Sequence, residues 1–213
     1  MSSVTYPQST TRTDAASARA AASSSRTLKV SHTAIWLAVC AIAMSFAALT
    51  SALIVRQGTG MDWKPFVLPP ILYLNTVFLL TSSFTVEFAR KQITAGAANS
   101  QSETRLLSRG RKWLYVSLGL AVLFVLGQTL AWRNLAAQGL FLATNPSCSF
   151  FYVLTALHGL HVLGGVLGLL YANHLLTRGF PYAKTSPLSV AAVYWHFMGI
   201  LWVYLFLILR IRM

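Results

Sequence analysis

Acidic residues are scarce in this chain. Only four Asp and Glu occur among 213 residues, against 17 Lys and Arg, and charged residues make up 10% of the sequence. Soluble domains carry about 25% charged residues, so this composition argues against a soluble protein. The two cysteines, Cys40 and Cys148, are too few for a disulfide framework and lack metal-site spacing. The sequence also has no Walker loop, dinucleotide-binding glycine pattern, CxxCH haem attachment or HExxH zinc motif.

Long apolar runs take the place of these features, and hydrophobic residues make up 55% of the chain. A helical membrane span requires ~20 apolar residues. Five segments meet this length: residues 33–55, 66–89, 113–132, 149–172 and 190–209. None has the alternating pattern of a membrane β-barrel strand. The sequence predicts an all-α, polytopic membrane domain over residues 32–213, with five transmembrane helices.

Basic residues divide unevenly among the connections between these segments. Twelve lie before the first span and after the second and fourth, whereas five lie on the opposite side. Cytoplasmic loops carry the excess of Lys and Arg, which predicts an N-terminus inside and a C-terminus outside. Spread in this way, the basic residues do not indicate nucleic-acid binding. Residues 1–31 are predicted to be a disordered basic cytoplasmic tail, with a mitochondrial transit peptide as the alternative.

One acidic residue, Glu87, lies within the predicted spans. It can form an ion pair with Lys91, four residues further along the helix. Intramembrane acids also mark proton paths, so a proton-handling carboxyl is the second interpretation. A proton path needs several such groups at staggered depths, and the spans supply one. The ion pair is therefore the favoured interpretation.

Three histidines lie in the last two predicted spans. His158 and His161 are one turn apart on the fourth, and His196 lies between two aromatic residues on the fifth. Bis-histidine haem ligation needs imidazoles from facing helices at matched depth, so His161 and His196 could hold a haem b. The alternative is that all three imidazoles bond to backbone, neighbouring helices or a partner subunit.

Small and polar residues predict how the helices pack. Gly164 and Gly168 form a GxxxG pair, which allows close helix contact. The second span is unusually polar, and its Asn75 can bond across helices. No internal repeat of the kind found in secondary transporters is present in the sequence, which counts against a transporter.

Three stretches together resemble subunit III of haem-copper terminal oxidases. They are LNTVFLLTSSFTVEFAR (Leu74–Arg90), FFYVLTALHGLHVLGGVLGLLY (Phe150–Tyr171) and YWHFMGILWVYLF (Tyr194–Phe206). With five spans, the chain is similar to the short form of this family. The resemblance implies a multi-pass subunit in the bacterial inner membrane, within a proton-pumping cytochrome c or quinol oxidase that reduces oxygen to water.

The resemblance also implies partners and residue roles. Subunit III of that family carries no haem or copper and is not itself catalytic. It assembles with subunit I, which is catalytic, and with subunit II, and it encloses phospholipid in a cleft. Six residues are therefore expected to line the lipid cleft or to make polar contacts between helices: Asn75, His158, His161, Trp195, His196 and Trp202.

The chain departs from the family pattern at several acidic positions. Many members place an acid after YWHF, where Gly199 stands, and some place one just before LNT, near Pro70. A Ser-Glu pair common in the first span is replaced by about Ala41 and Ile42. These departures remove the basis for a carboxylate role in proton delivery. A haem b membrane anchor and an accessory protein of a nitric oxide reductase remain the alternative functions.

Overall fold

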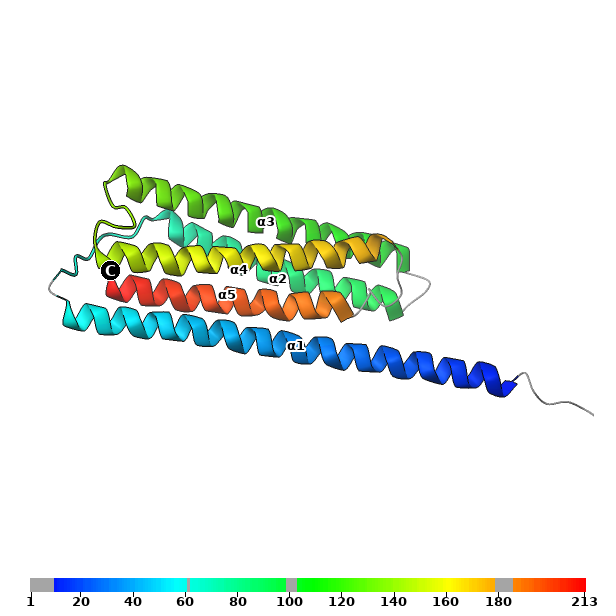
Figure 1. Ribbon diagram of the computed structural model, residues 1–213. Helices are drawn as coiled ribbons and strands as arrows, with labels where there is room; N and C mark the ends of the chain where they lie inside the picture. Colours follow the sequence, from blue (N-terminus) through cyan, green and yellow to red (C-terminus); the bar gives the residue numbers. More distant parts are fainter. Residues whose placement is uncertain (1–9, 61, 99–102, 179–185) are drawn as a thin grey trace, which may run out of the picture. The chain divides into compact units, whose positions relative to one another are not determined.

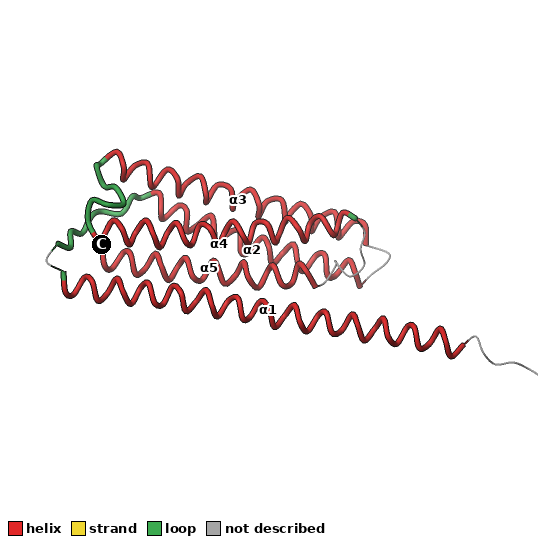
Figure 2. Tube along the Cα trace, viewed as in Figure 1, coloured by secondary structure: helices red, strands yellow, loops and turns green. Residues whose placement is uncertain are grey.

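Five helices make up the computed structural model (Figures 1 and 2), which describes residues 10–60, 62–98, 103–178 and 186–213. They are α1 (Thr10–Thr59), α2 (Ile71–Ala98), α3 (Glu103–Ala137), α4 (Pro146–Thr177) and α5 (Ser186–Arg212). Within these ranges the remaining residues form turns and loops, without a strand. The chain separates into two units, residues 1–38 and 39–213. The packing described below is that of residues 39–213.

Each helix contains a stretch long and apolar enough to cross a membrane, which confirms the prediction of five spans. The second helix begins later than predicted, at Ile71 instead of residue 66. Pro65, Pro69 and Pro70 explain the difference, because proline lacks an N–H group and disfavours helical backbone in the residue before it. The carbonyls of Pro69 and Pro70 accept hydrogen bonds from Leu72 and Tyr73, which closes the first turn.

Helix α1 starts at Thr10, within residues 1–31, for which the disordered tail stays a prediction from the sequence. This stretch contains six alanines, and alanine has the highest intrinsic helix propensity. Residues 1–9 lie outside the described part of the chain. The cytoplasmic location of this segment stays a prediction.

Helices α2 to α5 form a ring in which each helix packs against the next and α5 returns to α2. Inside the ring lie large side chains that are almost completely buried, among them Leu72, Phe124, Trp195 and Trp202. Helices α2 and α3 share the most extensive contact. The core is therefore formed by four helices, with α5 bridging α2 and α4.

The C-terminal part of α1, within residues 39–59, contacts α4 and α5 through long side chains. Among the described residues, no Cα of α1 lies within 8 Å of a Cα of another helix. Phe46 and Leu53 are fully buried at this seam. The Thr50 hydroxyl lies 2.9 Å from the Tyr204 hydroxyl of α5. Helix α1 is thus attached to the ring without close approach of the backbones.

Candidate functional site

Two tryptophans of α5 donate hydrogen bonds to hydroxyl groups of α2 inside the ring. Trp195 Nε1 lies 3.1 Å from Ser82 Oγ, and Trp202 Nε1 lies 3.0 Å from Thr76 Oγ1. Both indoles are buried. A buried indole N–H needs an acceptor, and the lipid interior supplies none. These bonds fix the rotation of α5 against α2, and they place Trp195 and Trp202 as inter-helix residues.

Helix α2 is also bonded to α3, through the same Ser82 and through other polar residues. Ser82 Oγ donates to the Ser117 carbonyl at 3.1 Å, and the Thr85 and Ser117 hydroxyls lie 2.7 Å apart. Asn75, fully buried, donates from Nδ2 to Gln128 Oε1 at 3.4 Å. In the structure, these polar residues of α2 bond to residues of α3.

A glycine makes room for the Asn75 amide. A Cβ atom placed on Gly127 of α3 would lie 1.9 Å from Asn75 Oδ1. Any side chain at this position would push Asn75 away from Gln128. The α2–α3 contact therefore depends on a small residue opposite a buried amide.

His158 lies at the centre of an aromatic cluster. Its ring is tilted against Trp202 at a centroid distance of 5.0 Å, and Phe124 and Phe46 present edges at 5.9 Å and 6.5 Å. The side chain is completely buried, and neither ring nitrogen has a hydrogen-bond partner among the described residues. His158 therefore joins α1, α3 and α5 by packing, in the way an aromatic residue would.

The histidine pair considered for haem ligation is not brought together. His161 turns toward α1, with its ring centroid 5.8 Å from that of Phe46, and its Nδ1 lies 2.7 Å from the Leu157 carbonyl of its own helix. His196 faces α2 instead, with Nε2 3.7 Å from Glu87 Oε2. A haem between helices needs both imidazoles to face one space. These two face different neighbours, which does not favour the haem-anchor alternative.

No group of three or more His, Cys, Asp or Glu that could hold a metal ion occurs among the described residues. The imidazoles of His161 and His196 are engaged with protein groups of their own or neighbouring helices. Nothing in their arrangement forms a ligand set.

Glu87 is held mainly by Arg90, with Lys91 more distant. The Arg90 guanidinium donates two hydrogen bonds to the carboxylate, at 2.6 Å and 2.9 Å. Lys91 Nζ lies 4.0 Å away, at the outer limit of an ion pair, and is largely exposed. The predicted pair with Lys91 is thus the weaker of two, because the planar guanidinium matches a carboxylate with two parallel bonds. His196 adds a third contact, across the α2–α5 seam.

Gly164 and Gly168, the predicted GxxxG pair, make no close contact with another helix of this chain. A Cβ on Gly164 would meet only the Tyr194 hydroxyl, at 3.8 Å, and one on Gly168 would meet nothing within 4 Å. Gly165 makes the close contact, because its Cβ would lie 3.0 Å from the Trp195 ring and 3.1 Å from the Tyr194 ring. Successive helical residues differ in direction by about 100°, so a shift of one position moves a glycine off the seam.

The residues that form this ring of helices match a known protein family. The model of the family described as cytochrome c oxidase subunit III matches residues 27–212. The chain belongs to the cytochrome c oxidase subunit III family.

Individual relatives in this family match most of the chain. Cytochrome c oxidase subunit 3 of Thermostichus vulcanus is 30% identical over 173 residues, covering 79% of this chain and 80% of the relative. The probable cytochrome c oxidase subunit 3 of Nocardia farcinica is 32% identical over 184 residues, covering 82% and 83%. That of Mycobacterium tuberculosis strain H37Rv is 33% identical over 164 residues, covering 72% and 73%. The similarity therefore extends over the spans and not over a single motif.

Within this subunit III chain, the HGLHV and YWHF stretches meet at the α4–α5 seam. Gly165 follows HGLHV by three residues and receives Trp195 of YWHF. The Tyr194 hydroxyl donates to the His161 carbonyl at 3.0 Å. Gly199, three residues after His196, is buried against α2, where its Cβ would lie 3.1 Å from Ser83 Oγ. The position that departs from the family pattern is thus a helix-packing position here.

Several residues of this network were not singled out from the sequence. Gln128 and Ser117 lie on α3, a helix without a recognised motif, and the i,i+4 spacing rule favours Lys91 over Arg90 as the partner of Glu87. A polar residue inside an apolar span was the available signal for Gln128 and Ser117, because such groups face protein instead of lipid. Nothing in the sequence distinguishes Gly165 from Gly164.

Proposed function

We propose that this chain is the accessory subunit III of a proton-pumping haem-copper terminal oxidase, in which it stabilises the catalytic subunit and carries no cofactor of its own. The observation that carries the proposal is the match to the cytochrome c oxidase subunit III family across residues 27–212. Haem and copper belong to the partner subunits, and the complex reduces oxygen to water in aerobic electron transport.

The packing of the ring supports a structural role. Asn75, His158, Trp195 and Trp202 are at most 1% exposed, so these side chains serve contacts between helices and leave lipid contact to the outer faces. The outer face of α2 is apolar, with Val77, Phe84 and Phe88 all more than half exposed. Monomeric soluble proteins rarely expose large apolar faces, and such faces mark membrane or subunit contacts. We assign these faces to phospholipid and to subunits I and II of a hetero-oligomeric complex.

The proposed setting is the inner membrane of a bacterium, with the N-terminus in the cytoplasm and the C-terminus outside. The division of basic residues, twelve against five, supports this orientation. In this orientation the Glu87–Arg90 pair lies near the inner end of α2. We propose that it fixes helix depth as an interfacial ion pair, without a catalytic role.

The test is purification of the chain through an affinity tag from the membranes of its own cells. The proposal predicts that a haem-copper catalytic subunit and a copper-binding subunit copurify and that the preparation consumes oxygen, with cytochrome c or a quinol as donor. A matched preparation from cells with untagged protein controls for carry-over. Recovery of the chain without any haem-copper subunit would overturn the proposal. Reduction of nitric oxide in place of oxygen would assign the chain to a nitric oxide reductase.

A further inference from the structure

A pocket of about 260 Å³ lies between the C-terminal ends of α2 and α4 and the N-terminal end of α3. Its lining residues are Ile93, Thr104, Leu107, Ser108, Arg111 and Leu176. The polar members, Thr104, Ser108 and Arg111, all come from α3. They are four and three residues apart, so they share one face of that helix. The pocket therefore combines apolar walls from three helices with a row of two hydroxyls and one guanidinium.

The Arg111 guanidinium has no acidic partner in the part of the chain that the structure describes. The acidic side chains described there are bonded to other arginines. The guanidinium lies beside the Tyr115 hydroxyl, and its buried Nε has no hydrogen-bond partner among the described residues. Leaving a charged donor without a partner costs free energy. Arg111 therefore holds a positive charge beside the pocket that a bound anion would stabilise.

The surrounding sequence adds to this positive charge. Residues 103–112 contain one acidic residue, Glu103, and four basic residues, which gives the segment a net charge of +3. Besides Arg111, the basic residues are Arg105, Arg109 and Lys112, and all three are exposed. An anion approaching the pocket is therefore attracted, and Arg111 is the basic residue that lines it.

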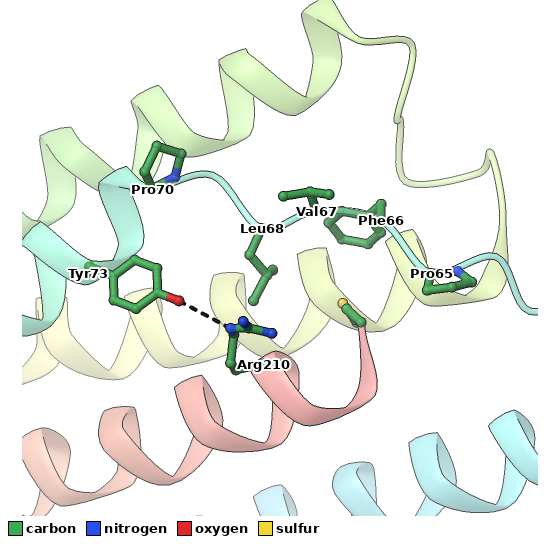
Figure 3. A pocket seen from close by; sticks show the side chains of 8 residues that line it. Pro65, Phe66, Val67, Leu68, Pro70, Tyr73 and Arg210 are labelled. Atoms are coloured by element: carbon green, nitrogen blue, oxygen red, sulfur yellow. Dashed lines mark hydrogen bonds between the residues drawn. The ribbon is translucent and has the colours of Figure 1, made fainter.

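Arg210, at the other end of the ring, is placed differently. It lines a pocket where α2 begins and α5 ends, and its Nε donates to the Tyr73 hydroxyl at 3.1 Å (Figure 3). Met213, with its terminal carboxylate, lines the same pocket. A carboxylate near a guanidinium weakens the attraction for an anionic ligand. The pocket beside Arg111 has no carboxylate among its lining residues, so it is the better anion site.

The position of the pocket along α3 favours a ligand that comes from water. The apolar segment of this helix, residues 113–132, begins after the pocket. Ser108 and Thr104 precede it by about 8 and 14 Å, at a rise of 1.5 Å per residue. The headgroup layer extends about 5 to 8 Å beyond the hydrocarbon on each side. The polar row therefore runs from the headgroup layer outward into water.

We propose that this pocket binds the phosphate group of a soluble compound. The terminal nitrogens of Arg111 bond two phosphate oxygens in the bidentate manner typical of arginine. The Ser108 hydroxyl now donates to the Arg105 carbonyl of its own helix at 2.9 Å, and it turns to donate to a third phosphate oxygen. The group that carries the phosphate lies against Leu107 and Leu176. The site requires only the folded ring, so it is independent of the function proposed above.

The test measures binding of inorganic phosphate to the full-length chain, purified in a maltoside detergent with the subunits that accompany it. Equilibrium dialysis against radiolabelled phosphate gives the number of sites and their dissociation constants. Arg111→Gln should weaken binding at one site per chain about tenfold, the factor expected for the loss of charge-assisted bonds. Arg111→Lys, which keeps the charge but not the planar fork, should bind with intermediate affinity. Ser108→Asp, which keeps Arg111 and adds a carboxylate beside it, should abolish binding at this site.

The matched control is Arg109→Gln, which removes an exposed charge from the same turn of α3 but outside the pocket. It should leave phosphate binding unchanged. Equal losses in Arg111→Gln and Arg109→Gln would overturn the proposal, because binding would then follow net charge. Wild-type protein without a phosphate site that Arg111→Gln weakens would also overturn it. Displacement of the phosphate by an excess of phosphatidylglycerol would show a site for lipid headgroups and contradict the assignment to a soluble compound.

Discussion

The ring of α2 to α5 and the membrane part of α1 are built differently. In the most apolar 18-residue stretch of α5, 50% of the residues are buried, against 22% in that of α1. The ring helices approach so closely that glycines are needed at their contacts, and buried hydrogen bonds join them. Over the described residues, by contrast, α1 contacts the ring through side chains such as Phe46 and without close approach of the backbones. The ring is therefore the more closely packed of the two regions. Helix α1 leaves more of its surface for lipid or a partner subunit.

The largest expected effect comes from a bulky residue inside the ring. Gly165→Leu should lower the free energy of unfolding by about 3 kcal/mol or more, because the new side chain overlaps the Trp195 and Tyr194 rings. Thermal or SDS unfolding of the purified chain, followed by circular dichroism, measures the change. Gly168→Leu on the same helix is the control and should be nearly neutral, since its Cβ meets nothing within 4 Å. Equal destabilisation by both variants would contradict the assigned rotation of α4.

Two substitutions of His158 test whether its buried imidazole stabilises the protein by packing alone. His158→Ala should cost about 3 kcal/mol, as for other large-to-small changes in a core. His158→Phe should cost less than about 1.5 kcal/mol, since it keeps the volume and removes two nitrogens that have no partner among the described residues. The same unfolding measurement applies. A Phe variant as unstable as the Ala variant would show that the imidazole nitrogens carry the stability.

A substitution of Ser82 tests how much the buried hydrogen bonds of the ring contribute to stability. Ser82→Ala removes the acceptor of Trp195 Nε1 and the donor to the Ser117 carbonyl. The expected loss is about 1.5 kcal/mol, near the upper end for hydrogen bonds between membrane helices. The neighbouring Thr81, which is exposed, provides the control, and Thr81→Ala should stay within about 0.5 kcal/mol. If the two variants behaved alike, the indole bond would contribute nothing measurable.

Substitutions at the seam between α1 and the ring should lower the stability less than substitutions inside the ring. A double-mutant cycle of Thr50→Val and Tyr204→Phe isolates the hydroxyl contact between α1 and α5. We expect a coupling energy of about 0.6 kcal/mol, the average for such pairs in a membrane protein. A coupling larger than the loss in Ser82→Ala would reverse the ranking of the two regions.

Substitution of Glu87 should have the smallest effect on stability. Because it forms a partly exposed ion pair with Arg90, Glu87→Gln should change stability by no more than about 0.5 kcal/mol. Oxygen-reduction turnover of the complex should stay unchanged. Arg90→Gln is the matched variant and should behave in the same way. A steep loss of turnover or pumping in Glu87→Gln, with normal assembly, would instead give the carboxyl a proton-handling role.

Much of the fold follows from local properties of the sequence. Five apolar runs define the five helices, and prolines 65, 69 and 70 explain why the second begins at Ile71. The family resemblance of the HGLHV and YWHF stretches is likewise carried by residues close together in the chain. Boundaries inside the basic N-terminal segment were harder to predict, because six alanines favour helix where low hydrophobicity suggests disorder.

The contacts between the helices depend on how each helix is rotated about its axis. The sequence of one span alone does not predict this rotation. A rotation by one residue decides whether Gly164 or Gly165 meets Trp195. The contact of His196 with Glu87 exists because α5 lies next to α2, a fact of the whole ring. Matched depth alone suggested that His161 and His196 could share a ligand, but the two imidazoles face different helices. The sequence therefore indicates which residues make contacts between helices more readily than it indicates the residues that they contact.

The most direct test of the account is the visible spectrum of the complex purified through a tag on this chain. The wild-type complex should show haem bands. The triple variant His158→Phe, His161→Phe, His196→Gln should show the same haem content per catalytic subunit, because the proposed function places the haem in the partner subunits. Wild-type material without haem would contradict the assignment as an oxidase subunit. Loss of haem from the triple variant, at an unchanged subunit ratio, would show that these histidines are ligands after all.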